Sequence, residues 1–307
     1  MNPLQKVLMA PQGPTLSRLV QGYWRLGSWN MNAQARLSFL KAHVEQGISS
    51  VDHAAIYDNG ECETLFGQAL ALDPSMCHQI EIISKFGINS SKHDKSHASA
   101  NKVGHYDSRK QAILASVDAS LSRLGVEKLD VLLFHRPDFL MDADQVALAF
   151  ETLKQSGKVM HFGVSNFTPS QFDLLQSRLD KPLMTNQVEI NPMQFEALED
   201  GTCDQMQQYR IRPMAWSCLT GGRVFSEQTA QAQRLRDTLF EVQQELGAIS
   251  IEQVMLSWVL HHPSKPVALL GSGKIERATQ AIQALEYELN NEQWYRIWVA
   301  SKGHPVP

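Results

Sequence analysis

The sequence has 307 residues, 43% of them hydrophobic and 20% charged, which is the composition of a globular protein and excludes a disordered or fibrous chain. The net charge of −4 excludes a strongly basic nucleic-acid binder, and no apolar run has the ~18 residues of a membrane span. The N-terminus lacks the apolar core of a signal peptide, so we expect a cytoplasmic protein whose four separate cysteines are reduced thiols.

Short apolar runs alternate along the chain with amphipathic segments. The runs are rich in Val, Ile and Leu and are continuously apolar, as in parallel strands whose two faces are both covered. They lie at residues 17–24, 48–53, 80–86, 129–135, 159–166, 183–190, 211–219 and 267–271. Each run is too short for a typical helix, so we predict a strand at each position.

The segments between these runs have the spacing and the end signals of helices. In residues 33–47, the apolar side chains of Leu37, Leu40 and Val44 fall on one face, and Gly47 follows as a stop. The predicted helices cover residues 33–47, 108–125, 142–157, 168–179, 201–210, 229–247, 250–262, 275–286 and 291–300.

Eight strands that alternate with helices predict an α/β fold, a (β/α)8 TIM barrel. No Pro-, Gly- or Ser-rich linker divides the chain, so we expect one domain over residues 1–307, with additional helices at 250–262 and 291–300. An open doubly wound sheet is the alternative fold. Such a sheet usually carries G-x-G-x-x-G after its first strand, and nothing similar follows residues 17–24.

Polar residues at the ends of the predicted strands are candidates for catalysis, because TIM-barrel active sites lie at the carboxyl ends of the strands. Asp52 ends the second run and Tyr57 follows it, Lys85 lies in the third run, and His135 ends the fourth. A phenol has a pKa of about 10, so it is a poor acid–base catalyst at neutral pH. A nearby Lys⁺ lowers this pKa, and a carboxylate beside the lysine keeps the lysine charged. The set predicts a proton relay for carbonyl reduction, with hydride from a cofactor.

These residues also have structural interpretations when each is considered alone. Asp52 fits a cap or a loop ion pair, Tyr57 fits an amphipathic surface residue, and His135 fits a hydrogen-bonded core histidine. For Lys85 the structural interpretation is a solvated face, which the apolar run around it disfavours. Their joint occurrence at successive strand ends is what favours catalysis, and position alone leaves both interpretations open.

The sequence resembles the aldo-keto reductase superfamily over nearly its whole length. The motifs are DHAAIYDNGECETLFGQAL, IISKFG, LDVLLFHRPD, GKVMHFGVSNF, TNQVEINP and GSGKIERATQAIQAL, while APQGP, GYWRL and PMAWSCL are similar to a branch of bacterial oxidoreductases. The resemblance implies NADPH-dependent reduction of aldehydes or ketones by a tetrad of Asp52, Tyr57, Lys85 and His135. Tyr57 would donate the proton, Lys85 and Asp52 would tune its pKa, and His135 would orient the carbonyl.

The resemblance also implies where the cofactor binds. Ser165 and Asn166 match the pair that binds the nicotinamide carboxamide, with Gln187 beside them, and Trp216 matches the aromatic residue that stacks on the nicotinamide ring. The other implied cofactor positions are Gly22, Tyr23, Trp24, Asp52, Ser217, Leu219, Gly221, Gly222, Gly271, Ser272, Gly273, Lys274, Arg277 and Gln280.

The stretch GSGKIER, residues 271–277, follows a predicted strand and begins a helix, an arrangement that favours anion binding. Lys274 and Arg277 place positive charge on the first turn, where the helix dipole disfavours cations. A bound anion would offset this cost, and the resemblance implies the 2′-phosphate of NADPH. The alternative is an exposed basic turn without a ligand.

Two further classes of protein remain open on the sequence alone. A binding protein of the potassium-channel β-subunit type could keep this barrel and cofactor without acting as an enzyme. A metal-dependent hydrolase would need His and Asp ligands at several strand ends, and Lys85 among them disfavours it. We expect no metal, a monomer, a small carbonyl substrate, and a solvated loop at 87–107 despite its His93, His97 and His105.

Overall fold

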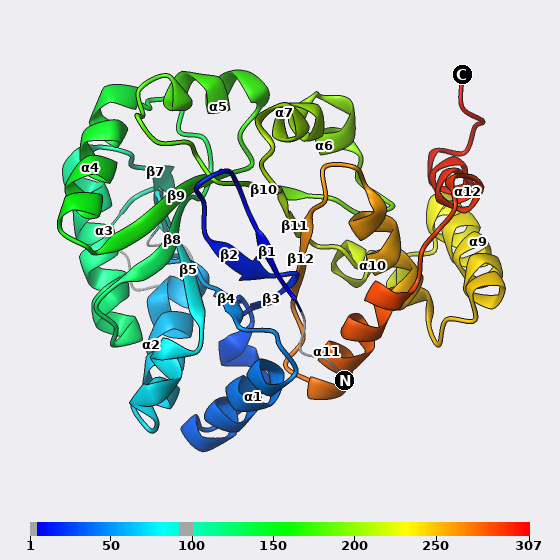
Figure 1. Cartoon of the computed structure of the whole chain (residues 1–307), viewed down its shortest axis with the longest axis horizontal. Helices are drawn as coiled ribbons and strands as arrows, with labels where there is room; N and C mark the ends of the chain where they lie inside the picture. The colour runs from blue at the N-terminus through cyan, green and yellow to red at the C-terminus, as the bar shows by residue number, and fades with distance from the viewer. Residues whose placement is uncertain (1–4, 92–100) are drawn as a thin grey trace.

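The computed structural model describes residues 5–91 and 101–307, which form a closed barrel of parallel strands inside a ring of helices (Figure 1). The strand order around the barrel is β10-β11-β12-β3-β4-β5-β8-β9. The barrel strands are β3 (Leu19–Gly22), β4 (Ser50–Asp52), β5 (Glu81–Phe86), β8 (Leu129–Phe134), β9 (Val159–Ser165), β10 (Asn186–Glu189), β11 (Met214–Trp216) and β12 (Val267–Leu270). Each strand lies within one predicted apolar run, which confirms the TIM barrel.

An N-terminal β-hairpin covers one end of the barrel (Figure 1) and corrects the first predicted strand. Ser17 exchanges hydrogen bonds with Ser50, the first residue of β4, so the hairpin lies at the amino ends of the barrel strands. The predicted strand 17–24 was wrong at its start, because Ser17 belongs to this hairpin. The hairpin strands are β1 (Lys6–Leu8) and β2 (Thr15–Ser17).

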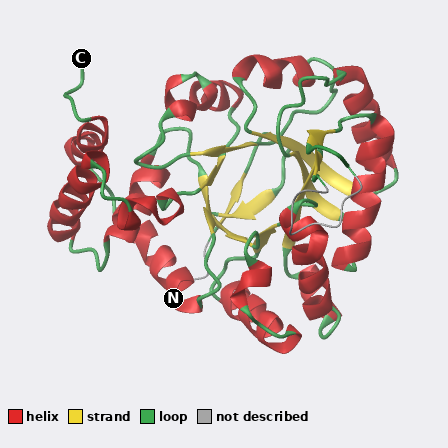
Figure 2. Cartoon of the chain, turned by 180° about the vertical axis from the view of Figure 1, so that it is seen from behind, coloured by secondary structure: helices red, strands yellow, loops and turns green. Residues whose placement is uncertain are grey.

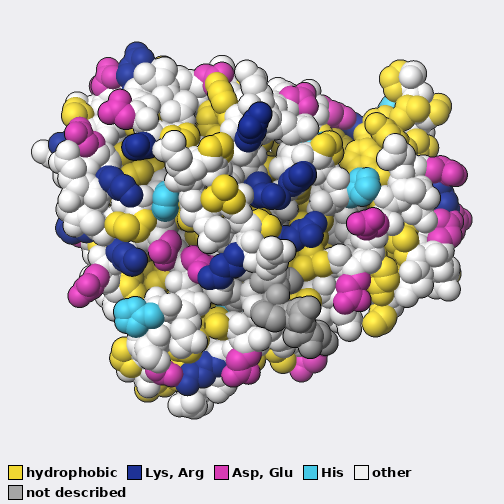
Figure 3. All heavy atoms as spheres, viewed as in Figure 1, with side chains coloured by type: hydrophobic (Ala, Val, Ile, Leu, Met, Phe, Trp, Pro, Cys, Tyr) yellow, Lys and Arg dark blue, Asp and Glu magenta, His cyan; other side chains and the backbone are white. Residues whose placement is uncertain are grey.

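The carboxyl ends of the strands therefore point to the opposite end of the barrel, which faces the viewer in Figure 2. After β5, the short strand β6 (Ile88–Asn89) pairs antiparallel with β7 (His105–Tyr106). His105 is exposed on it, whereas His93 and His97 of the predicted solvated loop lie outside the described residues. Figure 3 shows the face that carries the N-terminal hairpin. Several Lys and Arg side chains lie near the middle of this face, with Asp and Glu side chains among and around them.

Helices connect successive strands and cover the outside of the barrel. Several begin at side-chain caps: Asn32 accepts a hydrogen bond from the main chain of Ala35, and Thr168 and Asn290 form capping boxes. The α-helices are α1 (Ala33–Glu45), α2 (Glu61–Leu70), α3 (Lys110–Leu124), α4 (Ala143–Gln155), α5 (Pro169–Gln176), α6 (Glu196–Glu199), α7 (Thr202–Tyr209), α8 (Arg223–Ser226), α9 (Ala230–Leu246), α10 (Ile251–His261), α11 (Ile275–Gln283) and α12 (Asn291–Lys302). The 3-10 helices are η1 (Leu26–Trp29), η2 (Tyr57–Gly60), η3 (Pro74–His78), η4 (Thr220–Gly222) and η5 (Ala284–Glu286).

Helix α2 was absent from the sequence prediction, and Gly67 in its middle helps to explain why. Glycine is unfavourable inside a helix by about 1 kcal/mol relative to alanine. Here it allows α3 to approach, since a Cβ at Gly67 would lie 2.2 Å from the carbonyl oxygen of Arg123. The contact between the two helices therefore requires a residue that weakens the helical signal.

The additional helix next to the last strand is α9 rather than the predicted 250–262. Helix α10, which corresponds to 250–262, is largely buried and contacts β12, whereas α9 packs against α12 outside the ring (Figure 1). The indole rings of Trp258 and Trp294 stack with centroids 4.6 Å apart and join α10 to α12. Among the described helices, none is long and apolar enough to cross a membrane.

Candidate active site

The Lys85 ammonium group is the centre of a buried cluster at the carboxyl ends of β4 and β5. Its nitrogen lies 2.6 Å from Oδ1 of Asp52, 2.8 Å from the main-chain oxygen of His53 and 3.0 Å from the hydroxyl oxygen of Tyr57. A lysine ammonium has three N–H donors and no acceptor. All three donors are therefore used, and the Tyr57 oxygen accepts, so the phenol proton is free for another acceptor.

A left-handed turn places Tyr57 over this cluster. Asp58, Asn59 and Gly60 have φ angles of 47°, 53° and 88°. Asp, Asn and Gly are the residue types that most readily adopt this conformation. The turn η2 connects the segment after β4 to the start of α2.

Helix α2 is held in place behind the turn by a buried carboxylate. Glu63 is fully buried, accepts a hydrogen bond of 2.6 Å from Ser84 on β5, and pairs with Arg123 on α3. Because α2 begins at Glu61, directly after the turn, these bonds also fix the position of Tyr57.

His135 directly follows β8 and completes the predicted tetrad. Its imidazole meets the ring of Tyr57 edge to face, with centroids 5.7 Å apart. Its main-chain N–H donates to the oxygen of Phe86 at 3.0 Å, which anchors the residue to β5. The structure therefore brings together Asp52, Tyr57, Lys85 and His135.

Burial and charge set the protonation states of these groups. Burial raises the pKa of the Tyr57 phenol, and it outweighs the opposing effect of the Lys85 charge. The lowering effect of Lys85 that the sequence predicted is present, but the net shift of the Tyr57 pKa is upward. Burial opposes the charge on Lys85, yet Asp52 and Tyr57 outweigh it and raise the pKa of the ammonium group. Burial, together with Lys85 and Arg136, holds the pKa of His135 well below its ordinary value.

A second hydrogen-bonded group lies across the barrel from Asp52. The Ser165 hydroxyl donates to the main-chain oxygen of Gln187 at 2.8 Å, and the main-chain N–H of Asn166 donates to the same oxygen at 3.0 Å. The Gln187 amide nitrogen lies 2.8 Å from Oδ2 of Asp52. The indole N–H of Trp216 donates to the side-chain oxygen of Asn166 at 3.1 Å. The structure thus places the predicted carboxamide pair, Gln187 and Trp216 in one network.

The glycine loop after β11 has left-handed main-chain conformations at several positions. Ser217, Gly221 and Gly222 have φ angles of 54°, 63° and 89°, and Leu219 is half-buried beside them. Glycines at such positions let the main chain approach a ligand closely. Such an approach is what the pyrophosphate contact implied by the resemblance would require.

The loop after β12 presents positive charge at the start of α11. Lys274 is the N-cap residue of α11, and both Lys274 and Arg277 are exposed and pair with no carboxylate among the described residues. The Ser272 hydroxyl oxygen accepts from the main-chain N–H of Lys274 at 3.2 Å, and a Cβ at Gly271 would meet open space. The exposed side chains of Lys274 and Arg277 are the donors that could bind an anion such as a phosphate at this helix start. Gln280 is exposed further along the same helix.

Gly273 and Gly22 are glycines for reasons of packing. A Cβ at Gly273 would lie 2.5 Å from an indole carbon of Trp29. At Gly22, a Cβ would lie 2.9 Å from the main-chain oxygen of Leu270. Both close approaches tie the end of β3 and the loop after it to the end of β12.

The side chains of two predicted cofactor positions have contrasting surroundings. Tyr23 is 1% exposed, its hydroxyl lies 2.8 Å from Nε2 of His43, and its ring stacks on His53. Its side chain is therefore part of the core between the barrel and the helices. Trp24 is 62% exposed, with the guanidinium of Arg25 over its ring.

Arg136 also lies at this site, and it was not among the site residues predicted from the sequence. Its guanidinium carbon lies 5.7 Å from the ring centroid of Trp216, and it makes no ion pair or hydrogen bond with the described residues. The signal was present in the sequence, since a charged residue directly follows His135 at a strand end.

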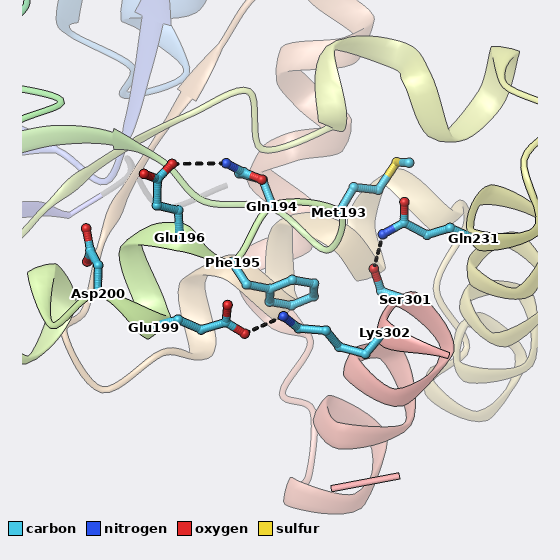
Figure 4. Close-up of a pocket in the computed structure, with 9 residues that line it drawn as sticks. All are labelled: Met193, Gln194, Phe195, Glu196, Glu199, Asp200, Gln231, Ser301 and Lys302. Atoms are coloured by element: carbon cyan, nitrogen blue, oxygen red, sulfur yellow. Dashed lines mark hydrogen bonds and ion pairs between the residues drawn. The ribbon is translucent and has the colours of Figure 1, made fainter. Parts of the chain in front are cut away.

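A separate cavity lies between the segment after β10 and the end of α12 (Figure 4). The Lys302 ammonium pairs with Glu199 and lies 4.7 Å from the ring centroid of Phe195. No predicted site residue lines this cavity. In the part of the chain that the structure describes, no group of three or more His, Cys, Asp or Glu side chains could hold a metal ion.

The fold and the buried cluster at the strand ends define the class as a TIM-barrel oxidoreductase. The model of the Aldo/keto reductase family matches residues 18–301, and the chain belongs to this family. The resemblance stated from the sequence motifs is thereby confirmed.

Two relatives and one solved structure illustrate the similarity. The chain is 52% identical to Oxidoreductase YdhF of Escherichia coli over 304 residues, which cover 99% of this chain and 100% of that protein. It is 36% identical to 6-dehydroglucose reductase of Agrobacterium fabrum, over 95% of this chain and 96% of that protein. The structure of glycerol dehydrogenase AKR11B4 from Gluconobacter oxydans matches with a TM-score of 0.83 and 23% identity, over 100% of this chain and 98% of the other, which shows the fold.

Proposed function

We propose that this oxidoreductase uses NADPH to reduce aldehydes or ketones to alcohols, with Tyr57 as the proton donor. The observation that supports the proposal most directly is the contact between Lys85 and Tyr57. The Lys85 ammonium donates to the phenol oxygen at 3.0 Å, which leaves the phenol proton available to a carbonyl oxygen.

Each residue of the tetrad has a separate task in this reaction. Bound NADPH would supply the hydride, and Tyr57 would supply the proton. The Lys85 charge would stabilise the phenolate that remains after transfer, and Asp52 keeps Lys85 charged inside the protein. His135 is neutral because its pKa is held low by burial, so its ring can donate one hydrogen bond to the carbonyl oxygen.

The residues that would hold the cofactor form two groups. Ser165, Asn166 and Gln187 would bind the nicotinamide carboxamide, and Trp216 would stack on the ring. Lys274 and Arg277 would bind the 2′-phosphate and so favour NADPH over NADH. The remaining predicted cofactor positions are Gly22, Tyr23 and Trp24 at the end of the first barrel strand, Ser217, Leu219, Gly221, Gly222, Gly271, Ser272, Gly273 and Gln280.

The proposal includes the cytoplasmic monomer expected from the sequence, and gel filtration tests the oligomeric state.

Polyhydroxylated aldehydes are the substrate class that we would test first. The relative from Agrobacterium fabrum is a 6-dehydroglucose reductase, whose substrate is a sugar derivative with a carbonyl group. Arg136 supports this choice, because an unpaired guanidinium at the site can donate several hydrogen bonds to hydroxyl groups.

Replacement of Tyr57 by Phe tests the proposal. We expect Tyr57→Phe to abolish reduction across a panel of sugar-derived, aliphatic and aromatic carbonyls while NADPH binding, followed by fluorescence, stays near the wild-type value. Tyr209→Phe is the control, because it removes a hydrogen-bonded phenol hydroxyl, which donates to Asp173, from α7 rather than from the strand-end cluster. Normal turnover by Tyr57→Phe would exclude the mechanism. Tight NADPH binding by wild-type protein without turnover of any carbonyl would instead favour a binding protein of the channel β-subunit type.

A further inference from the structure

A hydrogen bond crosses the barrel between two strands on opposite sides of it. In the strand order, three strands separate β4 from β10 in either direction, yet the Asp52 and Gln187 side chains meet at 2.8 Å. Asp52 is 1% exposed and Gln187 is 3% exposed. A bond between such groups is charge-assisted and is not weakened by solvent.

The orientation of the Gln187 amide follows from its neighbours. A carboxylate only accepts hydrogen bonds, so the atom that faces Asp52 is the amide nitrogen. The same nitrogen lies 3.9 Å from the sulfur of Met214, which also accepts. The main chain of Gln187 is fixed as well, because its oxygen accepts from Ser165 and Asn166.

The two oxygens of Asp52 consequently have different partners. Oδ1 accepts from Lys85 at 2.6 Å, and Oδ2 accepts from Gln187 at 2.8 Å. Without the amide, Oδ2 would remain buried without a donor, which is unfavourable for a carboxylate. The carboxylate could then rotate toward another donor, and its hold on Lys85 would weaken.

We propose that Gln187 is a positioning residue of the proton relay, which fixes the Asp52 carboxylate so that Lys85 stays charged and directed at Tyr57. This inference rests on the proposed function, since it concerns the same tetrad. It differs from the predicted role of Gln187 as a contact to the nicotinamide, because the amide acts here through Asp52.

Gln187→Leu removes the amide and keeps a similar volume. We expect kcat for carbonyl reduction to fall about 10- to 100-fold, as a small misplacement of reacting groups can cost about 100-fold. We also expect the alkaline limb of the kcat profile to move to higher pH, because a Lys85 ammonium that is less well directed at the phenol lowers the pKa of Tyr57 less. The groups that face the phenol are Lys85, Asp52 and Cys62, with His135 against its ring.

Gln205→Leu is the matched control, since Gln205 is also a buried amide that donates to a carboxylate, Asp173, but lies on α7. It should leave the pH profile unchanged. In a double-mutant cycle with Asp52→Asn, most of the loss caused by Gln187→Leu should disappear if the amide acts through Asp52. Unchanged kcat and pH profile with a raised KM for NADPH, persisting in the Asp52→Asn background, would overturn the proposal and leave Gln187 as a cofactor contact.

A measurement without cofactor or substrate separates this proposal from the proposed function. The alkaline titration of Tyr57 can be followed in the free protein as the difference in tyrosinate absorbance from Tyr57→Phe. Gln187→Leu should shift this titration to higher pH, and Gln187→Glu, which places a second acid beside Asp52, should shift it as well. Wild-type titration in both variants would overturn the positioning role even if no carbonyl substrate were found. If the wild-type protein reduced no carbonyl but the Gln187 variants still shifted the Tyr57 titration, the result would count against the proposed function alone.

Discussion

The ammonium nitrogen of Lys85 lies 3.0 Å from the phenol oxygen of Tyr57, with the lysine side chain fully buried. Replacement of Lys85 by Met removes the charge that stabilises the phenolate. We expect the rate of carbonyl reduction to fall about 10²- to 10⁴-fold, the range of a lost acid–base contribution. The variant should also lose about 3–5 kcal/mol of unfolding free energy, because Asp52 becomes an unpaired buried charge.

Lys158→Met is the control for this variant, since Lys158 forms an exposed ion pair with Asp118. Exposed pairs contribute about 0–1 kcal/mol. Single-turnover kinetics and urea unfolding measure both effects. A Lys85→Met protein with wild-type single-turnover rates would show that the contact has no catalytic role.

The pKa directions of Tyr57 and His135 predict a wide pH range of constant activity. Tyr57 can donate a proton only while its phenol is protonated. Because its pKa is raised, the phenol stays protonated up to and beyond about pH 10, the ordinary pKa of tyrosine. His135 stays neutral until the pH falls well below its ordinary pKa of about 6.5. The rate of the reductive step should therefore be flat between these two values. A fall within that range, measured by stopped-flow with saturating substrate, would contradict these protonation states.

The sequence predicted the barrel and the tetrad because both follow from local patterns. Strands that are covered on both faces read as continuous apolar runs, and each catalytic candidate lies where such a run ends. The orientation of the Tyr23 side chain could not be predicted from the apolar runs. Gly22 pairs in register with Asp52 and shares its face, so the next residue turns to the other face and its side chain enters the core.

The bond between Asp52 and Gln187 could not be predicted from the sequence for a different reason. The two residues are 135 positions apart, and their meeting depends on how the closed barrel positions β4 opposite β10. Two strand-end patterns contain these residues, but neither pattern says which strands face each other. The N-terminal hairpin was missed because its strands have only three residues each.

Lys274 and Arg277 should control the choice between NADPH and NADH. Each can make a charge-assisted contact to the 2′-phosphate, which is worth about 1.5–3 kcal/mol. We therefore expect Lys274→Ala and Arg277→Ala each to raise the KM for NADPH by about 10- to 100-fold. The KM for NADH should change little. Glu276→Gln, on the same turn, is the control, and equal effects on both cofactors would exclude phosphate recognition here.

Gly273→Ala should destabilise the protein by overpacking. The new Cβ would lie 2.5 Å from an indole carbon of Trp29, so the ring or the loop must move. Overpacking of this kind costs about 1–3 kcal/mol, measured by urea unfolding without cofactor. Gly271→Ala is the control, because its Cβ meets no atom within 4 Å. A second change, Trp29→Leu, should recover part of the loss in Gly273→Ala if the clash with the ring is its cause.

The burial of His53 predicts that the protein loses unfolding free energy as the pH falls. Its ring is fully buried against Tyr23, and neither ring nitrogen has a hydrogen-bond partner among the described residues. Burial, assisted by the Lys85 charge, lowers the pKa of His53 to about 3. The unfolded chain takes up the proton at about pH 6.5, so unfolding is favoured as the pH falls below this value.

His53→Phe keeps a ring beside Tyr23 and removes both unpaired nitrogens. At neutral pH we expect unfolding free energy equal to or above that of the wild type, since an unsatisfied buried polar group costs about 1–3 kcal/mol. Between about pH 6.5 and about pH 3, the variant should avoid a loss of about 1.4 kcal/mol per pH unit, as the linkage between protonation and folding requires. His43→Phe gives the contrast, because His43 bonds to Tyr23 and to the oxygen of Ile48 and its loss should destabilise at neutral pH. A His53→Phe protein that is less stable at neutral pH, with the same acid response as the wild type, would mean that the His53 ring has a polar partner in solution.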